Sequence, residues 1–306
     1  MLWIGSGLPL GMGRQAGKEL AMRGLARIES RLAVHFLLMN RPAHFLFCFV
    51  PLAAACFPAA SQPAAPQAFA HSTQMIVVVT PGWDAVQGRL QRFERTDTHE
   101  SWRPVGEPYA VVAGSKGMGW GIGLIASGDH GVRIETEPMK VEGDGKSPAG
   151  VFALGTAFGD AAQPLPGLKL PYLVLTPSIE CVDDASSKSY NRIVDRATAA
   201  PDWNSSEHMR DVGEAYRWGI VIDHNATIPG RIAPRPEGGS CVFLHIWHSP
   251  DHGTAGCTAM TRDNLESLLL WLDPARRPVL VQLPEPAYRR LAVPWSLPLP
   301  LAPVAH

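Results

Sequence analysis

Apolar and β-branched residues recur in short runs through the middle of the chain, separated by polar and turn-forming residues. Each run is bounded by Gly, Pro, Asp or Asn, which is typical of buried or half-buried strands. We expect strands at residues 75–79, 109–112, 172–175, 218–222, 241–245 and 278–283. Residues 132–142 are more mixed and only suggest another strand. Residues 86–95 are ambiguous, because Leu90 and Phe93 fit helical spacing while their neighbours are polar.

One segment near the C-terminus has the spacing of a helix. Its apolar stripe consists of four leucines at i, i+3, i+4 and i+7, which are Leu265, Leu268, Leu269 and Leu272. Asp263 is the candidate N-cap, and Glu266 follows three positions later as its capping-box partner. Pro274 helps to end the helix.

The order of these elements constrains the fold class. Strands that do not alternate with crossover helices argue against a doubly wound parallel sheet. We therefore expect a mainly β domain, either a β-rich sandwich or a mixed barrel, with one or two helices. A long polar stretch at residues 183–217 has weak periodicity. It is either a lid or binding loop, or a surface excursion without a role of its own.

The N-terminal part does not resemble a folded domain. Met39, Asn40 and Arg41 precede an apolar run at about residues 43–58, and small residues continue to Ala70. This order predicts a signal peptide at 39–70, followed by a linker at 71–74. Residues 1–38 are an uncertain upstream segment, either translated from before the true start or part of a long leader.

The leader predicts an exported protein of the periplasm or cell envelope. The protein would stay membrane-anchored if the leader were retained or if Cys56 were lipidated, since residues 52–56 loosely resemble a lipoprotein cleavage box. The folded domain is expected at 75–284, and residues 285–306 form a Pro-rich tail that wraps the domain or stays loose.

Composition excludes some classes of function. The 306 residues contain 27 Lys and Arg against 28 Asp and Glu, so the formal net charge is −1. A general nucleic-acid binder would need a basic face, so no nucleic-acid partner is expected. No later segment approaches about 20 uninterrupted apolar residues, so no interior membrane span is expected.

Candidate chemistry is concentrated between residues 241 and 260. Cys257 follows Gly256 in a loop between a predicted strand and the predicted helix, and His245 stands at the end of that strand. A thiol needs a base to become a nucleophile, and a Cys–His pair is the minimum for covalent thiol catalysis. Backbone N–H groups beside Gly256 could hold an oxyanion. The alternative is a buried structural cysteine and a structural histidine.

A zinc site is the competing functional interpretation of this segment. His245, His248, His252 and Cys257 are all potential zinc ligands. His245 and His248 are three apart in a strand-like segment, however, so they would point to opposite faces. We therefore expect no metal, and take His248 and His252 as loop residues near the mouth of the site.

Two motifs together resemble the L,D-transpeptidase (YkuD-type) family. His245 matches the family's strand histidine, Thr254 to Cys257 match the loop that ends in Gly-Cys, and Met260 matches the apolar residue after it. Upstream, residues 143–152, GDGKSPAGVF, resemble the glycine- and proline-containing signature of the family's central hairpin. The resemblance covers roughly residues 75–284.

The resemblance implies a mixed β-sandwich of the L,D-transpeptidase catalytic type. Cys257 would attack peptidoglycan stem peptides to form a thioester, with His245 as base and the carbonyl of Ile246 as third element. Gly256 would contribute to the oxyanion site, and His248, His252 and Thr254 would contact substrate. The expected role is cell-wall cross-linking or remodelling, without a cofactor or a protein partner. An L,D-carboxypeptidase or amidase of the same fold and a non-catalytic cell-wall binding module remain alternatives.

Three positions depart from the family pattern. Ala255 stands where many members have a second histidine, Ala259 where many have an arginine, and Ile246 where glycine or serine is usual. These departures indicate a divergent subfamily whose donor and acceptor specificity is open.

The other cysteines suggest a disulfide. Cleavage near Ala70 removes Cys48 and Cys56 and leaves an odd number of cysteines: Cys181, Cys241 and Cys257. If Cys257 is the free nucleophile, Cys181 and Cys241 can pair. The alternative is two separate buried thiols.

Overall fold

The structure is a computed structural model that describes residues 67–128, 132–226 and 233–298. The chain divides into two compact units, Met1–Pro58 and Ala59–His306, and all described residues belong to the second. The upstream segment, Cys56 and almost all of the predicted signal peptide lie outside the described residues. Within those residues, no helix is both long enough and apolar enough to cross a membrane.

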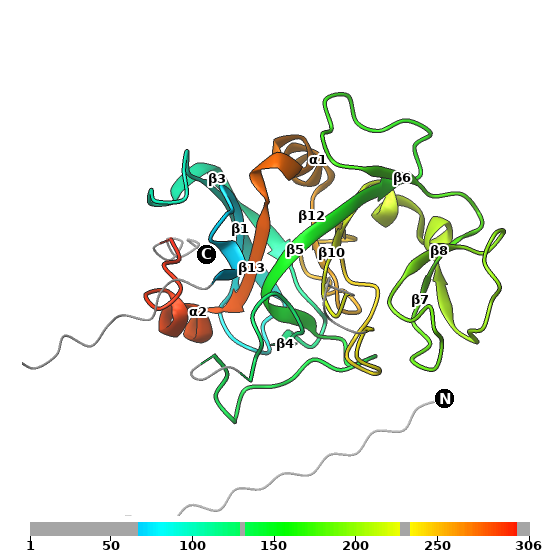
Figure 1. The fold of residues 1–306 in the computed structure, drawn as a ribbon, viewed down its shortest axis with the longest axis horizontal. Coiled ribbons are helices and arrows are strands. Elements are labelled where there is room, and N and C mark those ends of the chain that lie inside the picture. The colour runs from blue at the N-terminus through cyan, green and yellow to red at the C-terminus, as the bar shows by residue number, and fades with distance from the viewer. Residues whose placement is uncertain (1–66, 129–131, 227–232, 299–306) are drawn as a thin grey trace, which may run out of the picture. The chain divides into compact units, whose positions relative to one another are not determined.

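The described part of the chain is mainly β, as predicted, and its largest sheet closes into a barrel (Figure 1). The strands in that sheet run in the order β10-β11-β12-β3-β2-β1-β13-β5, and β5 pairs in turn with β10. Their bounds are β1 Gln74–Thr80, β2 Gln87–Glu94, β3 Arg103–Val112, β5 Ser147–Gly159, β10 Gly219–Ile222, β11 Phe243–Ile246, β12 Thr258–Met260 and β13 Val279–Pro284. Two short strands, β4 Met118–Trp120 and β6 Tyr172–Val174, extend the sheet beside β5.

The expectation of a sandwich is therefore wrong, and strand β5 is the reason. It is 13 residues long, and its first half, Gly150 to Ala153, pairs with β13. Its second half, from Leu154 to Phe158, pairs with β10. One long strand thus joins both ends of the sheet, whereas a sandwich needs two sheets packed face to face.

The strand predictions hold for all six apolar runs, since each overlaps one of β1, β3, β6, β10, β11 and β13. The ambiguous residues 86–95 form β2, where Leu90, Gln91 and Phe93 are buried. Residues 132–142 form no strand, and Met139 makes only an isolated bridge to Trp120.

The predicted helix is α1, Arg262–Trp271, and its leucine stripe is buried. Its N-cap is Thr261 rather than Asp263, because the Thr261 hydroxyl accepts the N–H of Asn264. A second helix, α2 Glu285–Leu291, occupies part of the expected tail. Proline is tolerated in a first helical turn, so Pro286 does not prevent it. Tyr288 of α2 is fully buried and ties the helix to the domain.

The polar stretch at 183–217 is built around a second, three-stranded sheet in the order β8-β7-β9. These strands are β7 Ile179–Val182, β8 Ile193–Asp195 and β9 Ser206–His208. Figure 1 shows β7 and β8 away from β1 and β13. A 3-10 segment, η2 Met209–Tyr216, leads back to β10. Two short 3-10 turns, η1 Gln67–Phe69 and η3 Pro274–Arg276, lie elsewhere.

A disulfide joins the two sheets. Cys181 of β7 is bonded to Cys241, just before β11, across 60 positions of sequence, so the predicted pairing is confirmed. Around it lies a second apolar cluster that includes Phe158, Tyr216 and Phe243. Cys257 is a buried free thiol within this cluster.

Candidate active site

Two neighbouring parallel strands place Cys257 and His245 two register positions apart. His245 on β11 is in register with Ala259 on β12, and Cys257 stands two residues before Ala259. Side chains alternate between the faces of a sheet, and residues in register share a face. Cys257 and His245 therefore lie on the same face. Ala259, where the resembled family often has arginine, is the residue directly beside His245.

His245 is held by a backbone carbonyl. Its Nδ1 lies 2.8 Å from the oxygen of Ile246, a contact in which Nδ1–H donates and Nε2 remains an acceptor. Burial lowers the pKa of His245 to about 4, and the hydrogen bond to Ile246 opposes this only in part. The imidazole is therefore neutral near pH 7. This geometry fits the role that the resemblance gives to the Ile246 carbonyl.

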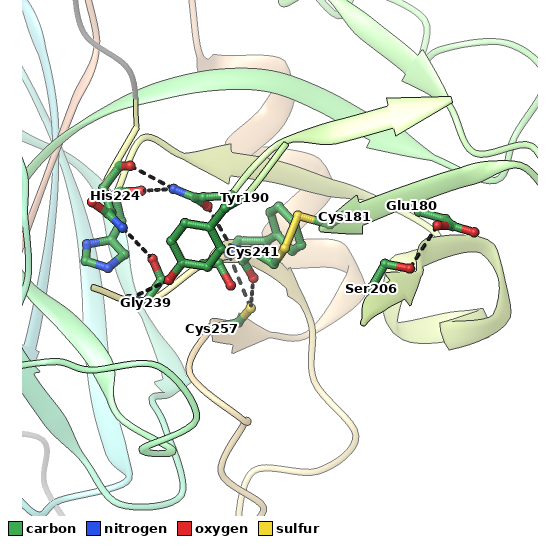
Figure 2. The surroundings of a disulfide bond; sticks show 12 residues. Glu180, Cys181, Tyr190, Ser206, His224, Gly239, Cys241 and Cys257 are labelled. Atoms are coloured by element: carbon green, nitrogen blue, oxygen red, sulfur yellow. Dashed lines mark hydrogen bonds between the residues drawn. A yellow bond between two sulfur atoms is a disulfide. The ribbon is translucent and has the colours of Figure 1, made fainter. Parts of the chain in front are cut away.

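The Cys257 sulfur is surrounded by backbone groups of the strand that carries His245. It accepts the N–H of Phe243 at 3.3 Å, and the thiol donates to the oxygen of Cys241 at 3.6 Å (Figure 2). Burial raises the pKa of the thiol to about 12, and the negative charge of Glu207 adds to this rise. Cys257 is only 8% exposed, so its resting form is a neutral, covered thiol.

The loop before Cys257 is fixed by two hydroxyl groups. Thr254 Oγ1 accepts the N–H of Gly256 at 3.1 Å and also donates to the oxygen of Cys257. Ser147, from the upstream motif, donates to the same oxygen at 2.6 Å and accepts the N–H of Gly114. The Thr254 hydroxyl is therefore hydrogen-bonded within the loop. The Gly256 N–H is likewise engaged, which leaves the Cys257 N–H as the candidate oxyanion donor.

A buried lysine lies against the same loop. The ammonium of Lys140 pairs with Asp144 at 2.7 Å, and its side chain is only 4% exposed. Gly256 adopts a φ of 156°, and a Cβ there would lie 3.2 Å from the oxygen of Lys146 and 3.5 Å from Nζ of Lys140. The tighter of these contacts is with the Lys146 oxygen. The positive charge of Lys140 favours ionisation of the Cys257 thiol.

His248 and His252 lie in the loop between β11 and β12 and are both exposed. Their rings contact each other, with centroids 5.9 Å apart. The neighbouring Asp251 accepts a hydrogen bond from Gln87, which anchors this part of the loop to β2. Neither histidine contacts the thiol directly in the described geometry. In the described ranges, no group of three His, Cys, Asp or Glu side chains could hold a metal ion.

Several residues at the site were not identified from the sequence. Ser147 lay within a motif but was not assigned a role, and Lys140 and Glu207 carried no signal. Tyr216 was included only in the polar stretch, yet its ring stands edge-on to His245 with centroids 5.4 Å apart. The polar stretch therefore contributes directly to the surroundings of the thiol.

A separate cavity of about 530 Å³ lies beside η1 and β5. Leu154, Leu170 and Arg277 are among the residues that line it. Neither Cys257 nor His245 does, so the cavity is not part of this site.

Comparison with protein-family models, with curated proteins and with solved structures yields no match. The likeness to L,D-transpeptidases therefore rests on the two motifs and on the geometry around Cys257.

Proposed function

We propose that the chain is a cysteine acyltransferase of the L,D-transpeptidase type, exported to the periplasm or cell envelope. The observation that carries this proposal is the placement of a free thiol and an oriented, neutral imidazole on one face of two paired strands. In this proposal the closed barrel is a form of the L,D-transpeptidase catalytic fold. Peptidoglycan stem peptides are the substrate, and cell-wall cross-linking or remodelling is the role.

The chemistry follows from the protonation states. Nε2 of His245 takes the thiol proton of Cys257, and the sulfur attacks the carbonyl carbon of the peptide bond after the diamino acid. The Cys257 N–H stabilises the oxyanion, and Lys140 adds positive charge nearby. The imidazolium returns its proton to the leaving amine as the C–N bond breaks. An acceptor amine then attacks the thioester and releases the thiol.

One observation favours a second candidate, a cell-wall binding module without turnover. Cys257 is nearly covered, and its pKa is raised to about 12, as expected for an inert structural thiol. A reactive site needs the thiol to be reached and ionised when substrate binds. Acylation therefore separates the two candidates.

Carbapenems acylate members of the resembled family, so they serve as the probe. Intact-mass measurement of the folded protein after incubation should show one adduct. That adduct should be absent in Cys257→Ala and should form more slowly in His245→Gln. The exposed His99 provides a matched control, and His99→Gln should behave like the unmodified chain. A folded, unmodified chain without any adduct would contradict the proposal and favour the binding module.

A further inference from the structure

Tyr216 is the residue that connects the polar stretch to the nucleophile. It ends η2 and is only 4% exposed. Its ring packs edge-on against Phe158, Phe243 and His245, with centroid distances of 5.3, 5.7 and 5.4 Å. Three aromatic contacts fix the ring, so the position of the hydroxyl is fixed as well. Tyr216 and Cys257 belong to the same apolar cluster, and the Cys257 sulfur and the Glu207 carboxyl both act on the Tyr216 hydroxyl.

Glu207 is the second residue that acts on this hydroxyl. It stands on β9 directly opposite Cys181, so the disulfide holds its strand close to the thiol. Its Oε1 is buried and has no hydrogen-bond partner among the described residues, so it is available to accept the Tyr216 hydroxyl. Burial raises the pKa of Glu207, and the nearby charge of Asp183 adds to this rise.

The Tyr216 hydroxyl has a single hydrogen to donate. In the resting site the thiol is neutral and donates to the Cys241 carbonyl, so a Glu207 carboxylate is the stronger acceptor. Once Cys257 loses its proton, the sulfur becomes a competing anionic acceptor. Two further groups act on that anion: the Phe243 N–H donates to it, and the Lys140 ammonium attracts it.

We propose that Tyr216 is a further catalytic residue, whose hydroxyl donates a hydrogen bond to the Cys257 thiolate, and that Glu207 is a positioning residue that competes for this hydroxyl. The inference rests on the proposed function, in which Cys257 is the nucleophile. The thiol proton moves to Nε2 of His245, Tyr216 keeps its own proton, and its hydroxyl donates to the sulfur instead of to the Glu207 carboxylate. The resting thiol and imidazole both favour their neutral forms, so proton transfer between them is unfavourable without groups that stabilise the anion.

The test is the rate at which iodoacetamide alkylates Cys257, measured from pH 6 to pH 10 on the full chain, with peptide mapping to isolate this cysteine. Tyr216→Phe keeps the aromatic packing and removes the donor, so alkylation at a fixed pH should slow about tenfold, as for a rise of about one pKa unit. Glu207→Gln removes the anionic competitor and should speed alkylation by about tenfold. The half-exposed Tyr109 is the matched control, and Tyr109→Phe should leave the rate unchanged.

The double variant separates the route through the hydroxyl from direct charge repulsion. In the Tyr216→Phe background, Glu207→Gln should accelerate alkylation by less than half of the factor seen in the unmodified background. An unchanged rate in a folded Tyr216→Phe variant would overturn the role of Tyr216. Slower alkylation in Glu207→Gln would overturn the competition, and this variant decides the matter alone if Tyr216→Phe does not fold. Alkylation that follows the expected pattern without any carbapenem adduct would uphold the thiolate contact and contradict only the proposed function.

Discussion

The thiol of Cys257 and the imidazole of His245 share a face of the sheet but do not form an ion pair at rest. Burial raises the pKa of Cys257 to about 12 and lowers that of His245 to about 4. Both shifts favour the uncharged form, as desolvation requires. The base form of His245 is therefore present at any pH well above 4, and the thiol keeps its proton until a far higher pH. In the proposed reaction, acylation would therefore depend on proton transfer during the reaction and not on a preformed thiolate.

This difference has a measurable consequence for pH dependence. The rate of acylation by a carbapenem should be nearly constant from about pH 5 to about pH 8, because neither residue changes its charge in that interval. Below it, the rate should fall as His245 becomes protonated near its pKa of about 4. Single-turnover rates from intact-mass measurements would give the profile. In His245→Gln, the fall in acylation rate at low pH should disappear. An acid limb near pH 6.5 in the unmodified chain would mean that the imidazole is not desolvated as the structure has it.

The sequence was informative for residues whose role depends on local context. Cys257, Gly256 and His245 stand within 13 positions of one another, and strand, loop and glycine signals mark all three. Ser147 and Tyr216 could not be found in this way. Ser147 reaches the Cys257 carbonyl across 110 positions, and its role depends on where β5 passes the loop. Hydrophobic periodicity does not contain that information, because it fixes faces of elements and not the register between distant ones.

At the scale of elements, α1 shows what periodicity can and cannot predict. Four leucines at helical spacing were enough to predict the helix and its buried face. The N-cap prediction was wrong, because Thr261 and Asp263 are both capping types and lie only two residues apart. Thr261 has extended backbone angles and its hydroxyl accepts the Asn264 N–H, whereas Asp263 already lies in the first turn. The spacing of apolar residues alone does not decide which of two nearby capping residues is the N-cap.

The two candidate caps give a direct comparison of stability. Thr261→Ala removes the hydroxyl that satisfies the Asn264 N–H and should lower the free energy of unfolding by about 1 kcal/mol. Asp263→Ala removes only a favourable charge near the helix N-terminus and should cost about 0.3–0.5 kcal/mol. Denaturant unfolding of both variants would measure the difference, and Thr261→Ser is the control that should retain most of the stability. A larger loss for Asp263→Ala than for Thr261→Ala would contradict the assigned cap.

Strand β5 explains why a barrel could not be distinguished from a sandwich in advance. Only its N-terminal part falls within a recognised motif, and no strand was expected over the segment that closes the barrel, Leu154 to Phe158. Both architectures use strands of similar composition with alternating faces. The distinction lies in which strands pair, and β5 pairs with β13 through one half and β10 through the other.

At the scale of the whole described domain, the barrel and the three-stranded sheet share one apolar cluster. Phe158 and Phe243 come from the barrel, Cys181 from β7 and Met209 from the polar stretch, and Cys257 lies among them. The disulfide fastens the polar stretch to the strand that carries His245. The stretch at 183–217 thus packs against the thiol through Met209 and Tyr216. If Tyr216 and Glu207 act as proposed, it also supplies groups to the reaction.

Removing the disulfide should therefore affect stability and thiol chemistry in different directions. A Cys181→Ala/Cys241→Ala variant reopens a loop of about 60 residues, which should lower the free energy of unfolding by roughly 2–4 kcal/mol. Looser cover would re-expose Cys257 to water and lower its pKa, since burial is the main cause of the raised value. Alkylation of Cys257 by iodoacetamide should therefore become faster, while carbapenem acylation should become slower, because it also needs His245 and the loop in place.

Thiol mapping on the unreduced, denatured chain provides the control for this prediction. Among Cys181, Cys241 and Cys257, only Cys257 should be labelled, and Cys257→Ala should keep the stability of the unmodified protein to within about 1 kcal/mol. Labelling of all three would show that no bridge forms. A bridge containing Cys257 in acylation-competent protein would contradict both the pairing and the nucleophile. If alkylation and acylation both accelerated in the double variant, the polar stretch would act as a barrier to the substrate, and its side chains would not be part of the catalytic site.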